Sequence, residues 1–218
     1  SSDLYDLLKK AWKIGLNSHI LAWPAFNVST FYVYTKFKPT LSKKTGIDLS
    51  GRKMRSTGLY KPMLNAMNAT AITISPSDVY AGLERGVVDG MAWPKGSVTK
   101  YGWEKFLKYR IEPAFYGATM TLLVNSNKWA SLSKASKMQI EKQALAYEAA
   151  ADAIIIKKGH EDDAKLLKAG IKVVNLKGKV RDAYIKTIYG AKWAENDSYA
   201  SKVDNYELLK SKLYDPNK

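Results

Sequence analysis

The chain has 218 residues, of which 46% are hydrophobic and 25% charged, the composition of a folded globular protein. It contains no cysteine, which excludes a disulfide framework, a thiolate metal site and a cysteine nucleophile, and no apolar run of about eighteen residues that would span a membrane. The excess of 35 Lys and Arg over 20 Asp and Glu gives a formal net charge of +15, which favours anionic partners such as small acids, nucleic acid or lipid head groups.

The first fifty residues predict a helix, two strands and a loop. In Asp3–Lys13 the leucines and a tryptophan recur at helical spacing on one face. The segment Ile14–Trp23 reads as a strand that ends before Pro24. Ser29–Pro39 alternates its side chains with a period of two, which predicts a strand with two usable faces. A loop over Thr45–Ser50 leads to the next segment.

The segment from Gly51 to Pro94 begins with a predicted strand, helix and strand. Lys53–Ser56 alternates polar and apolar side chains in the manner of a short strand. Leu59–Met67 spaces its large apolar residues at helical intervals, and Ala71–Ile74 is β-branched enough for a buried strand.

A second helix and a further strand complete this segment. The hydroxyl of Ser77 can cap a helix that stops at Gly86, and Met91–Trp93 then forms another short strand. Open α/β sheets bind small molecules at the carboxyl ends of their strands. Arg55 and Trp93 are therefore the side chains placed to meet a ligand.

The second half of the chain predicts more strands and one long helix. Ser133–Lys158 predicts a helix about 39 Å long that is broken at Gly159, resumes over Glu161–Ala169 and ends at Gly170. The remaining predicted elements are strands at Lys108–Glu112, Ala118–Val124 and Ile171–Asn175, followed by amphipathic segments at Val180–Tyr189 and Val203–Tyr214.

Three stretches together resemble a known family. The first runs Gly-x-Lys-x-Arg from Gly51 and continues as Ser-Asp-Val-Tyr-Ala-Gly-Leu-x-x-Gly-Val-Val-Asp-Gly from Ser77. The others are Lys100–Tyr109, which reads like a segment that crosses back between lobes, and Leu122–Ser133, a strand that leads into a long helix. In this order they resemble the solute-binding subunit of tripartite ATP-independent periplasmic (TRAP) transporters, the family of C4-dicarboxylate-binding-like proteins.

The resemblance implies an α/β fold of the two-lobed periplasmic-binding-protein type, with a long helix that spans both lobes. Residues 24–118 and 159–218 would form the second lobe, and residues 1–23 and 119–158 a remnant of the first. Members of the family are longer at the front, so we expect an incomplete first lobe and a missing N-terminal part.

The resemblance also implies capture without chemistry. An organic acid enters a cleft, a guanidinium pairs with its carboxylate, the lobes close about a hinge, and the loaded protein docks on the membrane permease subunits. We therefore expect a periplasmic, monomeric binding protein that is not an enzyme, needs no cofactor or metal, binds no nucleic acid and does not insert into the membrane. Arg55 is the expected carboxylate ligand, because its planar fork can donate two parallel hydrogen bonds.

Two departures from the family shape the expected ligand. Trp93 stands where many relatives carry asparagine, and Phe31 stands near the position of a second family arginine. A monocarboxylate with an apolar or aromatic body therefore fits better than a dicarboxylate or a sugar acid. The further expected ligand contacts are the aromatic walls Phe31, Tyr34, Phe26 and Trp23, and the strand-end residues Gly58 and Ser75.

Other functions are weighed against this one. A basic nucleic-acid-binding or scaffold module would show affinity that falls steeply with salt and depends little on Arg55. The lysines, however, are scattered without a run of five, which is typical of solvated helix faces. The sequence lacks the HExxH, GxSxG, Walker and GxGxxG motifs, and His160 before Glu161 reads as part of a solvated turn rather than a metal site.

Overall fold

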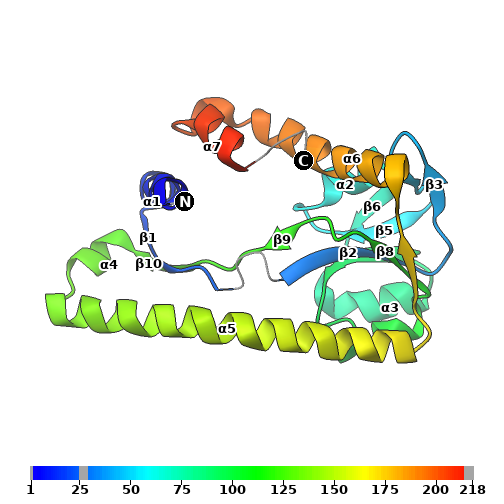
Figure 1. Ribbon diagram of the computed structural model, residues 1–218, viewed down its shortest axis with the longest axis horizontal. Coiled ribbons are helices and arrows are strands. Elements are labelled where there is room, and N and C mark those ends of the chain that lie inside the picture. The colour runs from blue at the N-terminus through cyan, green and yellow to red at the C-terminus, as the bar shows by residue number, and fades with distance from the viewer. Residues whose placement is uncertain (1, 25–28, 214–218) are drawn as a thin grey trace. The chain divides into compact units, whose positions relative to one another are not determined.

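The computed structural model describes residues 2–24 and 29–213, which form two compact units (Figure 1). Unit 1 comprises Ser1–Phe26, Thr119–Ile154 and Asn196–Lys218, and unit 2 comprises Asn27–Ala118 and Ile155–Glu195. These units differ from the predicted lobes chiefly at residues 196–218, which group with unit 1 rather than with the preceding helix. The assignment of the units to lobes stays a prediction.

Unit 1 is built on a two-stranded antiparallel sheet of β1 (Ser18–Ala22) and β10 (Leu122–Asn125). Helix α1 (Ser2–Leu16) precedes β1 and continues three residues into the segment predicted as strand. That prediction was wrong for residues 14–16, because the helix ends only at Asn17, whose φ of 47° is a left-handed conformation that asparagine tolerates. The other elements are α4 (Ser126–Ala130), the first part of α5 (Lys134–Lys168), a 3₁₀ turn η4 (Ala200–Lys202) and α7 (Tyr206–Leu213).

Unit 2 contains a seven-stranded mixed sheet with the order β11-β8-β2-β7-β5-β6, in which β9 also pairs with β2. Strands β5, β6 and β7 are mutually parallel, β8 and β11 are parallel to each other, and β2 is antiparallel to both β7 and β8. The strands are β2 (Ser29–Thr35), β5 (Lys53–Ser56), β6 (Thr70–Thr73), β7 (Gly90–Pro94), β8 (Tyr109–Glu112), β9 (Gly117–Ala118) and β11 (Lys172–Asn175).

Helices cover both faces of this sheet, with α2 (Lys61–Ala66) and α6 (Gly178–Asp197) on one face and α3 (Val79–Glu84) and α5 on the other (Figure 1). Two buried clusters fill the layers. Val33 belongs to the cluster that includes α2 and α6 residues, whereas its neighbour Tyr34 belongs to the cluster that includes α3 and α5 residues. The alternation of the strand thus feeds both cores, as its period of two predicted.

A small hairpin of β3 (Thr40–Ser42) and β4 (Gly46–Asp48) falls partly in the predicted loop. Its turn ends at Gly46, which has a φ of 83° and would carry a Cβ only 2.4 Å from the Cα of Tyr184. Both the backbone conformation and the close approach of α6 therefore require glycine here.

The long helix α5 runs unbroken from Lys134 to Lys168, so the predicted break at Gly159 was wrong. Its 35 residues correspond to a length of about 52 Å at the standard rise. A glycine costs a helix only about 1 kcal/mol, and contacts of the helix just after Gly159 can offset that cost. The Asp162 carboxylate accepts hydrogen bonds from the backbone amides of Val98 (3.2 Å) and Thr99 (3.0 Å), which fastens this part of α5 to unit 2.

The predicted cap at Ser77 was also wrong. Residues Pro76–Asp78 form a 3₁₀ turn, and α3 begins at Val79 with no side-chain hydrogen bond to its N-terminus. The Ser77 hydroxyl instead pairs with that of Ser75 at 2.6 Å. The predicted end of the helix was correct, because Gly86 has a φ of 72° just beyond the C-cap.

Candidate functional site

The candidate site lies in unit 2, where three parallel strands end side by side. Arg55 is paired in register with Ile72 of β6 and with Met91 of β7, so the carboxyl ends of β5, β6 and β7 meet at one edge of the sheet. The residues at or just beyond these ends include Arg55, Ser75 and Trp93, all three predicted for the site. The strands are only four or five residues long, so local alternation and the following turn residues were enough to predict where each strand ends.

Arg55 is the centre of this edge. Its side chain is only 1% exposed. The Nε donates a hydrogen bond of 3.1 Å to the carbonyl of Ile74, and Nη1 donates to the hydroxyl of Tyr60. The guanidinium carbon lies 4.8 Å from the ring centroid of Trp93, within the range of a cation–π contact. These contacts hold the plane of the guanidinium in one orientation.

The charge of Arg55 has no anionic partner in the part of the chain that the structure describes. None of the salt bridges there includes it, and Tyr60 alone among titratable groups acts on it. Burial lowers the pKa of Arg55, and Tyr60 opposes that effect. A buried cation that lacks a carboxylate is costly, because most buried charges in proteins are paired.

Arg110 of β8 shows the usual arrangement in the same unit. It is 6% exposed, and it forms salt bridges of 2.5 Å to Asp163 and 2.6 Å to Glu112. Burial acts to lower the pKa of Arg110, but Asp163 and the other acids outweigh it and the pKa is raised. The two arginines are therefore buried alike, and only Arg110 is neutralised by carboxylates of the described chain.

Tyr60 is a residue of the candidate site that the sequence patterns did not predict. It lies just before α2, is 2% exposed, and packs its ring against Phe31 and Phe115 at centroid distances of 5.8 and 6.3 Å. Burial raises the pKa of Tyr60, so the phenol keeps its proton. Because an arginine can only donate, the Tyr60 oxygen accepts from Arg55, and the Thr57 side chain is a second hydrogen-bond partner of the same hydroxyl. The sequence signal that could have predicted this role is that Tyr60 follows Arg55 by only five residues, across the turn between β5 and α2.

Trp93 lies beside Arg55 on the adjacent strand, β7. Its indole Nε1 donates a hydrogen bond of 2.7 Å to the Ser97 hydroxyl. Its ring packs edge-on against Trp103 at 4.8 Å and against Tyr101 at 6.1 Å. These neighbours hold the indole in place. Because the indole is only partly buried, part of its aromatic surface remains accessible to a ligand.

The other predicted contacts are spread over the unit. Phe31 and Tyr34 are buried in different core clusters, and Tyr34, whose pKa is raised by burial, has a hydroxyl with no partner among the described residues. Phe31 packs against Tyr60, which accepts from Arg55, and Tyr34 lies in the cluster against which Trp93 packs. Gly58 is exposed in the turn after β5, and Ser75 is exposed and hydrogen-bonded to Asp78 at 2.6 Å. Their contact with a ligand stays a prediction.

For the remaining two predicted walls, contact with a ligand also stays a prediction. Phe26 lies outside the described residues, and Trp23 belongs to unit 1, where its backbone amide donates to the Glu148 carboxylate at 2.7 Å. Among the described residues, no three side chains of His, Cys, Asp or Glu gather in a way that could hold a metal ion.

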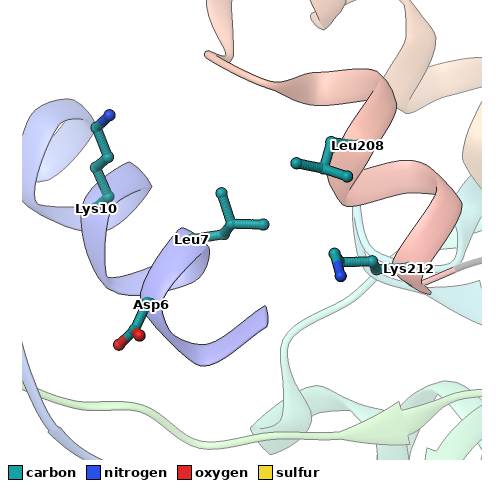
Figure 2. A pocket seen from close by; sticks show the side chains of 5 residues that line it. All are labelled: Asp6, Leu7, Lys10, Leu208 and Lys212. Atoms are coloured by element: carbon teal, nitrogen blue, oxygen red, sulfur yellow. The ribbon is translucent and has the colours of Figure 1, made fainter. Parts of the chain in front are cut away.

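Unit 1 has a hollow of its own between α1 and α7 (Figure 2). It has a volume of about 510 Å³ and is lined by Asp6, Leu7, Lys10, Leu208 and Lys212. Leu7 and Leu208 reach toward each other across it, while Asp6 and Lys10 point away (Figure 2). Its polar groups do not converge on one point, so it is a weaker candidate than the edge around Arg55.

An α/β unit with a buried guanidinium at the carboxyl ends of its parallel strands has the architecture of small-molecule-binding proteins. The family model of bacterial extracellular solute-binding proteins, family 7, matches residues 10–195. The chain belongs to this family of extracellular solute-binding proteins, which agrees with the resemblance found in the sequence. No helix in the described ranges combines the length and the apolar character of a membrane span.

Individual relatives agree with this assignment. The chain is 29% identical over 126 residues to a monocarboxylate 2-oxoacid-binding periplasmic protein of Nostoc sp. strain PCC 7120, a match that covers 56% of this chain and 34% of that protein. A TRAP periplasmic solute-binding protein from Chromohalobacter salexigens with bound D-glucuronate superposes with a TM-score of 0.76 at 20% identity, over 96% of this chain and 66% of the other. One from Desulfovibrio desulfuricans with bound sn-glycerol-3-phosphate gives 0.76 at 17% identity, over 94% and 64%.

The similarity to these solved structures establishes the two-lobed fold of the family for this chain. The chain spans less than two thirds of the length of each of the proteins just described, and only about one third of the Nostoc protein.

Proposed function

We propose that this protein captures an organic-acid anion, a monocarboxylate with an apolar or aromatic body, and delivers it to a TRAP-type membrane permease. The observation that carries the proposal is the buried guanidinium of Arg55, which has no carboxylate partner among the described residues. A ligand carboxylate would supply the missing negative charge at the edge of the sheet where α/β proteins bind ligands.

The orientation of Arg55 supports a carboxylate in particular. Ile74 and Tyr60 take the Nε proton and one Nη1 proton, which leaves the remaining N–H donors for a ligand. The three remaining N–H donors lie in the plane of the guanidinium, and they match the two oxygens of a carboxylate better than a single ammonium would.

The surroundings of Arg55 support a single carboxylate on an apolar body. Arg110, the other buried arginine of unit 2, is already neutralised by Asp163 and Glu112, so it does not offer a second charge to a dicarboxylate. Trp93 and Phe31 provide aromatic surfaces next to Arg55 and Tyr60. The Nostoc relative is a monocarboxylate-binding protein, and relatives of known structure hold the carboxylates glucuronate, galactonate and pantoate.

The test is calorimetric binding of a panel of monocarboxylates, dicarboxylates and sugar acids to the protein and its variants. We expect a monocarboxylate to bind with no turnover, and Arg55→Met to weaken its affinity by about 100-fold or more, since loss of one partner of a buried charge pair costs about 2–5 kcal/mol. Arg55→Lys should recover little of this loss, because an ammonium lacks the planar fork. Tyr60→Phe, which removes the hydroxyl that accepts from Arg55 and helps to orient it, should weaken binding by about tenfold.

Arg52 provides a matched control on the same segment. It is exposed at the start of β5, so Arg52→Met removes the same charge without touching the site. This variant should bind the acid as the unchanged protein does. Full affinity in Arg55→Met, or equal losses in both variants together with a steep dependence on salt, would contradict the proposal and favour a general polyanion-binding module.

A further inference from the structure

The positive charge of the chain is concentrated in unit 2. Residues 27–118 and 155–195 contain 24 Lys and Arg against 11 Asp and Glu, whereas the rest of the chain is close to neutral. The scattered appearance of the lysines in the sequence hides this difference, because unit 2 is assembled from two separate segments.

Within unit 2, four lysines line up along one edge of the sheet, which we call the basic rim. Lys53 and Lys172 are the first residues of β5 and β11, Lys108 directly precedes β8, and Lys36 directly follows the antiparallel β2. Backbone hydrogen bonds join them: the amide of Lys108 donates to Thr35 at 2.9 Å, and that of Lys172 donates to the carbonyl of Lys108 at 2.8 Å. The rim is thus the edge opposite to the carboxyl ends of β5 and β7 that carry Arg55 and Trp93.

The rim has the dimensions for its charges to act together. Adjacent strands lie about 4.8 Å apart, so the row from β11 to β5 is about 19 Å long. Lysines on adjacent strands are therefore about 5 Å apart along the row, and Lys36 and Lys53, two strands apart, about 10 Å. These distances are close to the screening length of about 8 Å at physiological ionic strength. Lys53, Lys108 and Lys172 are exposed, while Lys36 is half-buried and donates to the carbonyl of Leu83.

Few acids offset the rim. Asp89, which precedes β7, is the acid within the rim: its carboxylate accepts a hydrogen bond of 2.9 Å from the backbone amide of Lys53 and its charge acts on Lys36, so it offsets one of the four lysines. Glu84 at the end of α3 is followed by Arg85. Two apolar side chains flank the lysines instead: Val87, in the turn before β7, is 46% exposed, and Val173, next to Lys172, is 40% exposed.

We propose that the basic rim adsorbs the protein peripherally to a membrane surface that contains anionic phospholipids. Exposed lysines are mobile point charges without fixed geometry, which suits a fluid array of lipid head groups better than a shaped protein or nucleic-acid partner. The flanking valines can be buried in the head-group layer, whereas an acidic peptide offers no apolar layer to bury them. A periplasmic protein has access to such surfaces, and adsorption by the rim leaves the edge around Arg55 free.

The experiment is co-flotation of the protein with vesicles of phosphatidylcholine that contain 30% phosphatidylglycerol, with pure phosphatidylcholine as reference. The rim variant Lys53→Gln, Lys108→Gln, Lys172→Gln is compared with the control variant Lys61→Gln, Lys177→Gln, Lys179→Gln. The control lysines are equally exposed and follow the opposite ends of β5 and β11, so both variants lose three charges. Thermal unfolding of each variant checks that it is folded.

We expect binding to the anionic vesicles only, decreasing with added salt. The rim variant should bind about 100-fold more weakly, since each lysine near an anionic surface contributes about a fivefold factor, and the control variant and Arg55→Met should bind as the unchanged protein does. Equal weakening of rim and control variants would overturn the proposal, because the effect would then follow net charge alone. Failure to bind anionic vesicles would also overturn the proposal. Binding to polyglutamate, measured as a model of an acidic peptide, in the absence of vesicle binding would assign the rim to a protein partner instead.

Discussion

Replacing Arg55 and Arg110 by methionine should change the stability of the ligand-free protein in different ways. Both side chains are buried, but Arg110 is paired with two carboxylates and Arg55 with none among the described residues. Exchange of buried charge for an apolar side chain is often neutral or stabilising by about 1–4 kcal/mol, provided that no opposite charge is left behind. The absence or presence of such a partner should therefore decide the result.

For Arg55→Met the gain is offset by two lost hydrogen bonds, to Ile74 and Tyr60, of about 1 kcal/mol each. The expected net change in the free energy of unfolding is within about 1 kcal/mol of zero. For Arg110→Met, Asp163 and Glu112 lose their partner, which costs about 3 kcal/mol, the lower end of the range, because Lys95 still contacts Asp163 at 2.5 Å.

The assay is thermal unfolding in a buffer free of organic acids, followed by circular dichroism. At about 2–4 °C per kcal/mol for a chain of this size, Arg110→Met should lower the midpoint by about 6–12 °C, and Arg55→Met should leave it within a few degrees. An equal fall in both variants would refute the reasoning, because Arg55 would then be a structural ion-pair residue and the argument for a ligand anion would lose its basis.

Two further predictions concern the fold. Gly159→Ala should stabilise α5 by about 0.5–1 kcal/mol, because the nearest atoms to the added methyl belong to the Lys95 side chain at an ordinary 3.5 Å. Gly96→Ala should destabilise the protein, because Gly96 has a φ of 96° and the added methyl would lie 3.3 Å from the Gly159 nitrogen. Urea unfolding measures both changes, and a change of the same sign in both variants would contradict this account of the contact. Burial, and next Lys9, lower the pKa of His19, so the folded state binds its proton less well than the unfolded state, and stability should fall as the pH drops below about 6.5. Thermal unfolding of His19→Gln between pH 8 and pH 5 should show a flatter profile, and an unchanged slope would contradict the assignment.

Much of the segment from Gly51 to Pro94 could be predicted because its signals are local. Alternation over Lys53–Ser56, helical spacing after Leu59 and the glycine at position 86 each act within a few residues, and the structure has a strand, a helix and a helix end at these places. The placement of Arg55 beside Trp93 followed from one general rule about the ends of parallel strands.

Features that depend on contacts between distant residues could not be predicted in this way. Gly159 looks like a helix breaker from its neighbours alone, but the neighbouring Asp162 binds the backbone of Val98 and Thr99, more than sixty residues earlier in the chain. In the sequence Tyr60 is simply an aromatic residue near the start of a helix, and only the folded structure shows that its hydroxyl accepts a hydrogen bond from Arg55.

The sequence by itself determined the α/β pattern, the family and the arginine at the end of β5, because these follow from the order and local spacing of side chains. Only the tertiary structure decided which charges are neutralised. Salt bridges form between residues that the fold brings together, so it took the folded sheet to distinguish Arg110, held by Asp163 from α5, from Arg55, whose guanidinium is buried without an acid among the described residues. The same assembly of two segments into one sheet collects scattered lysines into a single rim.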